Sequence, residues 1–365
     1  MKIARIDSHS IKVPYTFGGS HQGEGLRTWT TNNILLVRVE TDTGIVGWGE
    51  AFCYACTDAV RAALHNMVGP LAIGQDARDI AKLSYDLQQK LHLFGRYGIT
   101  IFALSGLDIA LWDIAGKAAG LPVHRLLGGS DAVELRCYAS LIRYTDPEVV
   151  AENVARALDQ GFRHLKLHEI DPAAVGAARA TAGDEVEITL DVNCPWSVRE
   201  GLDMARRLRP FNLRWLEEPV WPPENYEGLA KMRRESGIPI AAGENASTLM
   251  DFGQMLRAEA VDFLQPSPAK MGGITELCKV FALANAHNTP VMVHTFYDGP
   301  GLLASVQASA ALGSKDALIE WRYFDLEAQL YGDAIIPRNG AIAVPQGPGL
   351  GIEPNADVIR DYRRA

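Results

Sequence analysis

Three carboxylates each stand near the end of a short β-rich run and could together bind a metal ion. Asp191 lies in ITLDVN, Glu217 in RWLEEP and Glu244 in IAAGEN, about one βα unit apart. If the three runs are neighbouring parallel strands, their negative charges meet at one rim, where a cation must offset the repulsion. Three oxygen ligands, with water or substrate in the remaining positions, suit octahedral Mg²⁺. The alternative is that these residues are solvated carboxylates in separate loops.

Groups that can hold or move a proton end the flanking runs. Lys166 and His168 in HLKLHE are two residues apart, so both point inward if the intervening leucines pack outward. His294 in VMVHTF and Glu320 in LIEW end two later runs. A single histidine is more often a structural residue, but two histidines on opposite sides of a metal site indicate proton transfer.

A glycine-rich segment near the N-terminus has the composition of a lid over a ligand. It is TFGGSHQGEGLRTW, residues 16–29, and it contains His21 and Arg27. These side chains can contact a polar, anionic ligand, which favours a hydroxylated acid over an aromatic one. A surface loop without any ligand contact is the alternative.

The runs that carry these residues alternate with helical stretches, as the strands of a parallel sheet built from βα units do. The expected strands are 135–140, 164–168, 186–192, 213–216, 239–242, 261–264, 291–294 and 318–321. Eight strands separated by helices favour a closed barrel over an open sheet, which more often stops at five or six strands. The active site should then lie at the carboxyl ends of the strands.

The segments before and after the predicted barrel do not show its alternation of strands and helices. Residues 33–40 and 45–49 form two β-rich runs around Asp42-Thr-Gly44, a hairpin signal, and helical spacing follows at 58–67, 79–93 and 100–119. Past residue 332 the sequence becomes rich in Pro and Gly, which suits a tail that returns over the first part. We expect an α+β capping domain at 1–130, a barrel domain at 131–330 and the tail at 331–365.

Composition excludes several classes of protein. The 365 residues are 47% hydrophobic and 22% charged, as in a globular protein, and the net charge of −9 without a basic run makes nucleic acid an improbable partner. The start of the chain lacks the apolar stretch of a signal peptide, and 99–121 is interrupted by charges, as in a buried helix. We therefore expect a cytoplasmic protein without a membrane anchor.

The cysteine pattern does not indicate a second metal site. Cys53 and Cys56 form one CxxC pair, and the other cysteines are isolated along the chain. A tetrahedral zinc site would need a second pair, so we expect reduced cysteines.

The motifs together resemble the mandelate racemase subgroup of the enolase superfamily. They are residues 103–129, LDVN, LEEP, AGEN, KMGGIT and the closing PGLGIE, and they span nearly the whole chain. The resemblance implies a modified TIM barrel, (β/α)₇β, under an N-terminal α+β capping domain that the C-terminal tail completes. It also implies Asp191, Glu217 and Glu244 as Mg²⁺ ligands, Asn193 as a substrate contact, and a homo-oligomer.

Two positions depart from the subgroup's pattern. The second strand of the barrel usually carries Lys-x-Lys, whose second lysine is the base, and here His168 takes that place. An imidazole can be a neutral base near pH 7 without a large pKa shift, so the role is preserved, and Lys166 remains the cation for the substrate carboxylate. Ser267 stands where members with a His-Asp dyad carry the aspartate, so His294 lacks that carboxylate. His294 then either suits proton donation better or is oriented by a neighbour that the sequence does not reveal.

The chemistry implied is removal of the proton next to a substrate carboxylate, with Glu320 as a further donor to the developing charge. Our first prediction is a dehydratase that converts a sugar acid, an aldonate or aldarate, into a 2-keto-3-deoxy acid. The second is a racemase, epimerase or cycloisomerase of a related acid or lactone. A metal-dependent binding protein without catalysis is the third.

Overall fold

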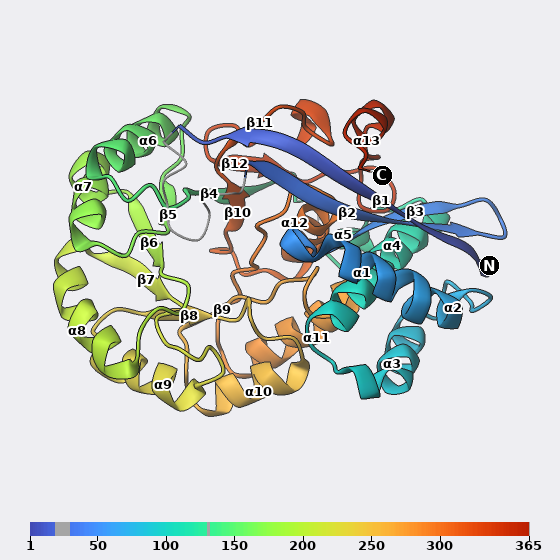
Figure 1. The fold of residues 1–365 in the computed structure, drawn as a ribbon, viewed down its shortest axis with the longest axis horizontal. Coiled ribbons are helices and arrows are strands. Elements are labelled where there is room, and N and C mark those ends of the chain that lie inside the picture. The colour runs from blue at the N-terminus through green and yellow to red at the C-terminus, as the bar shows by residue number, and fades with distance from the viewer. Residues whose placement is uncertain (19–29, 130–131, 365) are drawn as a thin grey trace.

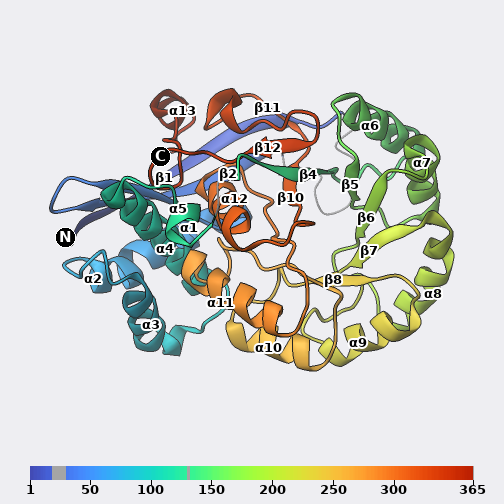
Figure 2. The same cartoon turned by 180° about the vertical axis from the view of Figure 1, so that it is seen from behind.

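The structure is a computed structural model that describes residues 1–18, 30–129 and 132–364. An antiparallel sheet with its helices forms a cap beside a barrel of parallel strands, and the long β1–β2 ribbon extends from the cap toward the barrel (Figure 1). Seen from behind, helices α6 to α10 form the outer arc around the barrel strands (Figure 2). The fold is α/β, and the cap-plus-barrel architecture agrees with the sequence-based prediction.

The cap sheet has the strand order β11-β1-β2-β3. These strands are β1 (Ile3–Thr16), β2 (Thr31–Thr41), β3 (Val46–Ala51) and β11 (Asp325–Leu326). The predicted hairpin joins β2 to β3, and Gly44 adopts the positive φ of 83° that its turn requires.

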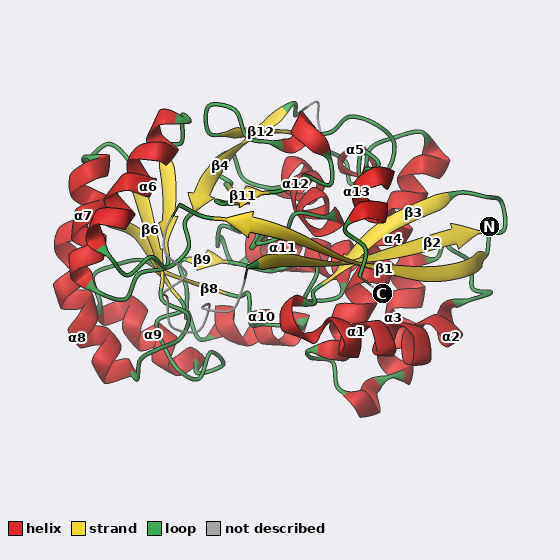
Figure 3. Ribbon diagram, turned by 45° about the horizontal axis from the view of Figure 1, so that its top comes forward, coloured by secondary structure: helices red, strands yellow, loops and turns green. Residues whose placement is uncertain are grey.

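Helices pack on one side of this sheet (Figure 3). They are η1 (Tyr54–Cys56), α1 (Thr57–Ala63), η2 (Leu64–Val68), α2 (Gly69–Ala72), α3 (Ile80–Lys90), η3 (His92–Phe94) and α4 (Ile99–Ala119). The short helix α5 (Val123–Leu126) follows, and its Val123 packs in the core of the barrel instead. Helix α4 is long and apolar enough to cross a membrane, but 78% of its apolar window is buried inside the protein, as in a core helix. It ends at Gly120 in the left-handed conformation.

The barrel strands run parallel in the order β10-β4-β5-β6-β7-β8-β9. They are β4 (Glu134–Ser140), β5 (His164–Leu167), β6 (Glu187–Asp191), β7 (Leu213–Glu217), β8 (Ile240–Ala242), β9 (Phe263–Leu264) and β10 (Ile319–Arg322). The helices outside them are α6 (Pro147–Asp159), α7 (Pro172–Ala182), α8 (Val198–Leu208) with η4 (Arg209–Phe211), α9 (Tyr226–Glu235), α10 (Leu249–Arg257), α11 (Gly273–Ala286) and α12 (Pro300–Leu312).

One predicted strand, 291–294, is reduced to a single bridge between Val291 and Leu264. On the side that faces β9, the backbone of this segment still bonds to the neighbouring strand, since Met292 N donates to Leu264 O at 2.8 Å. On the side that faces β10, the donor to the Glu320 carbonyl is the Thr295 hydroxyl, at 2.6 Å, and not a backbone N–H of the segment. A side chain therefore joins this segment to β10, which is why the expected strand is not formed there.

The C-terminal tail returns to the cap, as predicted. It contains η5 (Gly332–Ile335), β12 (Ala341–Ala343), which pairs with β4, and α13 (Ala356–Asp361). Arg364 N bonds Ser10 O, and Leu350 N bonds Asp113 Oδ1 at 2.8 Å. Strand β11 already pairs with β1 before the tail begins, so the chain crosses between barrel and cap more than once. The boundaries 1–130, 131–330 and 331–365 stay a prediction.

Asp108 joins the cap to the barrel at a buried interface between α4 and α11. Its Oδ1 accepts a hydrogen bond from Thr275 N at 3.0 Å, whereas Oδ2 has no hydrogen-bond partner among the described residues. A Cβ on Gly273 would lie 2.2 Å from this carboxylate, so the two elements can approach only because residue 273 is glycine. Burial raises the pKa of Asp108 to about 7.

We expect the free energy of unfolding of Asp108→Asn to depend less on pH than that of the unmodified protein. Between the unfolded pKa of 3.8 and the folded pKa of about 7, the folded protein keeps a proton that the unfolded chain has released. The free energy of unfolding should therefore fall by roughly 1.4 kcal/mol per pH unit in that window and level off above it. Urea unfolding at pH 5 and at pH 8 measures this fall in the free energy of unfolding. The fall should be smaller in Asp108→Asn than in the unmodified protein, and unchanged in Asp58→Asn, a control at an exposed aspartate. Equal falls in all three proteins would show that Asp108 is charged throughout.

Candidate active site

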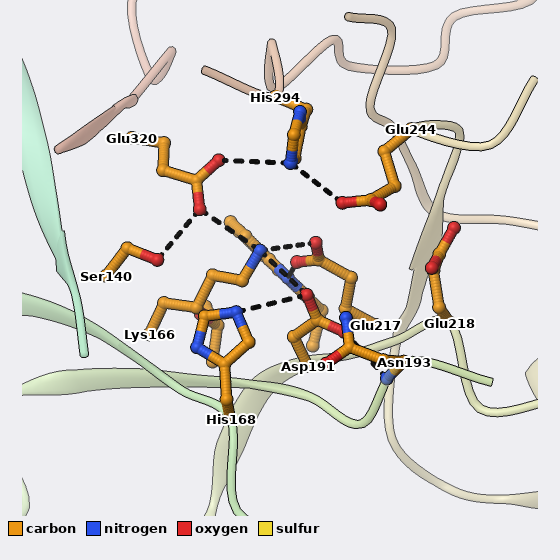
Figure 4. A network of polar contacts seen from close by, with 12 residues as sticks. Ser140, Lys166, His168, Asp191, Asn193, Glu217, Glu218, Glu244, His294 and Glu320 are labelled. Carbon is orange, nitrogen blue, oxygen red and sulfur yellow. Dashed lines mark hydrogen bonds and ion pairs between the residues drawn. The ribbon is translucent and has the colours of Figure 1, made fainter. Parts of the chain in front are cut away.

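The three predicted carboxylates meet at the carboxyl ends of adjacent barrel strands (Figure 4). Asp191 ends β6 and is paired in register with Glu217, which ends β7, and Glu244 stands two residues after the end of β8. One ligand oxygen from each lies within 4.8 Å of the others. Asp191 Oδ2 is buried without a hydrogen-bond partner among the described residues, although cations lie near it. Converging oxygen atoms of this kind fit a divalent metal ion.

Burial and neighbouring charges set the ionisation of these carboxylates. Burial raises the pKa of Glu217 to about 7. Burial alone would also raise the pKa of Asp191 and Glu244, but the positive charges beside them outweigh it and lower both values. The charges are those of Lys166 for Asp191, and of His294 and Lys270 for Glu244. The cluster therefore depends on cations for its stability.

Lys166 is fully buried and points into this cluster, as its inward position on β5 predicts. Its Nζ lies 2.6 Å from Glu217 Oε1, 3.0 Å from Asp191 Oδ2 and 3.2 Å from Glu320 Oε1. Burial alone would lower the pKa of Lys166, but the three carboxylates raise it well above the usual value. The three carboxylates thus favour the charged form of Lys166, which can hold an anionic group.

His168 enters from the same strand end with a defined tautomer. Its Nδ1 lies within hydrogen-bond distance of the Leu141 carbonyl, which can only accept, so Nδ1 must carry the hydrogen. In the neutral ring, Nε2 then carries the lone pair, and it faces the cluster 3.4 Å from Asp191 Oδ2. The arrangement suits a base that takes a proton at Nε2.

His294 lies across the cluster from His168 (Figure 4). Its Nε2 lies 2.8 Å from Glu244 Oε2, and its Nδ1 lies 3.1 Å from Ser267 Oγ, which also bonds the Tyr297 hydroxyl. Burial would lower the pKa of the ring, but the charge of Glu244 raises it. A hydroxyl, that of Ser267, thus stands beside His294 in place of the dyad carboxylate. The neighbour that orients the His294 ring is therefore the Ser267–Tyr297 pair.

Glu320 accepts hydrogen bonds in this structure. Its Oε1 accepts from Ser140 Oγ at 2.8 Å and its Oε2 from Thr295 N at 3.1 Å. Burial would raise the pKa of Glu320, but Lys166 and His294 lower it. Glu320 is thus placed to pair with Lys166, and its role as a donor to the developing charge stays a prediction.

Of the three predicted substrate contacts, Asn193 lies within the described residues. Asn193 follows β6 with a positive φ of 55°, is exposed at the mouth of the barrel, and donates its N–H to Asp191 Oδ1 at 2.9 Å. Figure 4 shows its side chain beside Asp191. His21 and Arg27 lie outside the described residues.

The structure adds three residues to the site that the sequence patterns did not single out. Ser140 ends β4 at the same rim, and the strand-end argument would have found it. Lys270 lies 3.4 Å from Glu244 and over the Phe52 ring, and only its place in KMGGIT pointed to it. Tyr297 gave no local signal, because its contact with Ser267 spans 30 residues.

Comparisons with known proteins agree with this geometry. Residues 149–358 match the "Enolase C-terminal domain-like" family, and residues 24–128 match the N-terminal domain of mandelate racemase / muconate lactonizing enzyme. The chain is 33% identical to arabinonate dehydratase of Saccharolobus solfataricus, with 90% of each chain covered. It is 32% identical to D-galactarolactone cycloisomerase of Agrobacterium fabrum, over 90% of this chain and 91% of the relative.

Solved structures show the same relationship. A racemase from Streptomyces coelicolor with bound magnesium superposes with a TM-score of 0.86 at 29% identity, over 99% of this chain and 100% of that one. The relatives thus include both activities that the sequence left open, and one of them holds a metal that suits the carboxylate cluster. This chain belongs to the mandelate racemase / muconate lactonizing enzyme family of the enolase superfamily.

Proposed function

We propose that the protein removes the proton next to the carboxylate of a sugar acid and dehydrates it to a 2-keto-3-deoxy acid. The observation that carries the proposal is His168, whose Nδ1 is tied to Leu141 and whose Nε2 faces Lys166 and the carboxylate cluster. The relatives named as sugar-acid dehydratases and cycloisomerases support this substrate class. Racemisation, epimerisation or cycloisomerisation of a related acid or lactone is the alternative.

Asp191, Glu217 and Glu244 would hold one Mg²⁺. When bound, the ion supplies positive charge to the substrate oxygens, on which negative charge builds as the proton leaves. Its ligands in this chain are three oxygens from neighbouring strands, so the remaining positions stay free for substrate and water.

The residues around this cluster would bind the substrate and transfer its protons. Lys166 holds the substrate carboxylate, and His168 Nε2 takes the α-proton. From the opposite side, His294 Nε2 gives a proton to the departing β-hydroxyl, or to the carbon in the isomerase alternative. Asn193, with His21 and Arg27 of the lid segment, would contact the hydroxyl groups. A homo-oligomer and a cytoplasmic location belong to the same proposal.

Incubation with Mg²⁺ in D₂O and a panel of aldonates and aldarates should test this proposal. Dehydration yields a 2-keto-3-deoxy acid that contains solvent deuterium, and a chelator should stop its formation. Deuterium in recovered acid of inverted configuration, without keto acid, would favour the isomerase alternative. Binding of the acids without either product would overturn catalysis and leave a metal-dependent binding protein.

A further inference from the structure

A cavity of about 210 Å³ lies between the cap and the mouth of the barrel. Strands β1 and β2 and the segment η1 line it from the cap, and residues after β4 and at the end of β10 line it from the barrel. Phe296 forms part of its wall, and the Phe296 ring lies 6.1 Å from that of His168. The cavity is therefore next to the proposed base.

Arg322 brings a buried guanidinium to this cavity. It is 5% exposed and stacks with its charged group 4.3 Å from the Phe324 ring centroid and 4.9 Å from that of Phe296. Its Nη2 lies 2.5 Å from Asp298, but Nε has no hydrogen-bond partner among the described residues. A buried donor without a partner is costly unless a ligand supplies the acceptor.

The position of Arg322 on β10 shows how far the cavity lies from the site where the substrate would react. Glu320 and Arg322 are two residues apart on β10, so both point into the barrel, and Arg322 lies about 7 Å closer to the cap. Lys166 lies 3.2 Å from Glu320, and so deeper in the barrel than Arg322. An acid held by Lys166 and extended toward the cap would thus bring its far end to Arg322.

Lys12 adds a second cation from the cap. It lines the same cavity, is exposed, and has no ion pair within the part of the chain that the structure describes. Across the β1–β2 ladder it is paired in register with Asn33, which also lines the cavity, as does the buried Asn32. Arg322 is paired with Asp298, whereas Lys12 has no ion-pair partner among the described residues, so an anionic group bound in the cavity would balance the charge of Lys12.

From this arrangement we infer that Arg322 and Lys12 form a subsite for a second carboxylate, so that the substrate is a dicarboxylic sugar acid or its lactone rather than an aldonate. The inference rests on the proposed function, because Lys166 must hold the first carboxylate. Asn32 Nδ2 donates to Asp298 and Asn33 Nδ2 to the Tyr54 carbonyl, so the amide oxygens of the two residues are the groups that would accept from hydroxyls next to the second carboxylate. The far carboxylate would give the uncommitted Nε of Arg322 an acceptor.

The test compares an aldarate with the aldonate of the same carbon number and configuration. Calorimetry in the presence of Mg²⁺, on the His168→Asn protein so that substrate persists, should give a Kd about tenfold or more lower for the aldarate. Lys12→Gln should reduce this preference about tenfold, whereas Lys90→Gln, an exposed lysine on α3, should leave it unchanged. The pair Arg322→Gln with Asp298→Asn, which removes both buried charges together, should also reduce the preference.

Failure of the inference differs from failure of the proposed function. Equal affinity for both acids, with Lys12→Gln weakening both alike or neither, would overturn the subsite even if wild-type protein exchanges the α-proton of the aldonate. Absence of α-proton exchange with every acid in the wild-type protein would overturn the proposed function and the subsite with it. The Lys12 side chain has no ion pair or hydrogen bond with the residues that the structure describes, so Lys12→Gln should fold and keeps the test valid if the double variant does not fold.

Discussion

Glu217→Gln should abolish turnover and leave the fold intact. The amide keeps the shape of the side chain but is a poorer ligand, and it removes one negative charge from the cluster. Changing a residue that only supports a metal ligand typically costs about ten- to a hundredfold in affinity or activity, so loss of a ligand should cost at least a hundredfold. Mg²⁺ titration by calorimetry and the rate of keto-acid formation measure the two effects, and circular dichroism reports the fold.

A carboxylate at the other end of the same barrel provides the control. Glu187 begins β6, the strand that Asp191 ends, and pairs with Arg214 and His164 away from the cluster. Glu187→Gln should therefore keep both Mg²⁺ binding and turnover. Full activity of Glu217→Gln would remove Glu217 from the ligand set.

His168→Asn should stop exchange of the α-proton with solvent while Mg²⁺ binding survives. A general base typically contributes about a hundred- to ten-thousandfold, and an amide cannot take the proton. The asparagine can still donate to the Leu141 carbonyl, so the strand end should keep its structure. Deuterium incorporation followed by NMR measures the exchange, and His164→Asn, at the opposite end of β5, serves as the matched control.

His294→Asn separates the two histidines. If His294 only protonates the departing hydroxyl, this variant should lose keto-acid formation and keep α-proton exchange. Exchange at the wild-type rate in His168→Asn, together with none in His294→Asn, would reverse the roles and place the base on the opposite face of the substrate.

The sequence by itself determined which residues gather at the site. Because side chains alternate along a strand and parallel strands end at one rim, the spacing of Asp191, Glu217 and Glu244 brought the carboxylates together. The same alternation turned Lys166 inward, and in the structure the leucines beside it pack outward. These properties are local to a strand or follow from the βα repeat, so they are visible without coordinates.

Only the tertiary structure decided how those residues are held. The tautomer of His168 depends on the Leu141 carbonyl, 27 residues away, and the orientation of His294 depends on Ser267 and Tyr297. The meeting of Arg322 with Lys12 depends on how the cap docks against the barrel. Such contacts join segments distant in sequence, and their geometry follows from strand register and packing, which no local pattern of residues specifies.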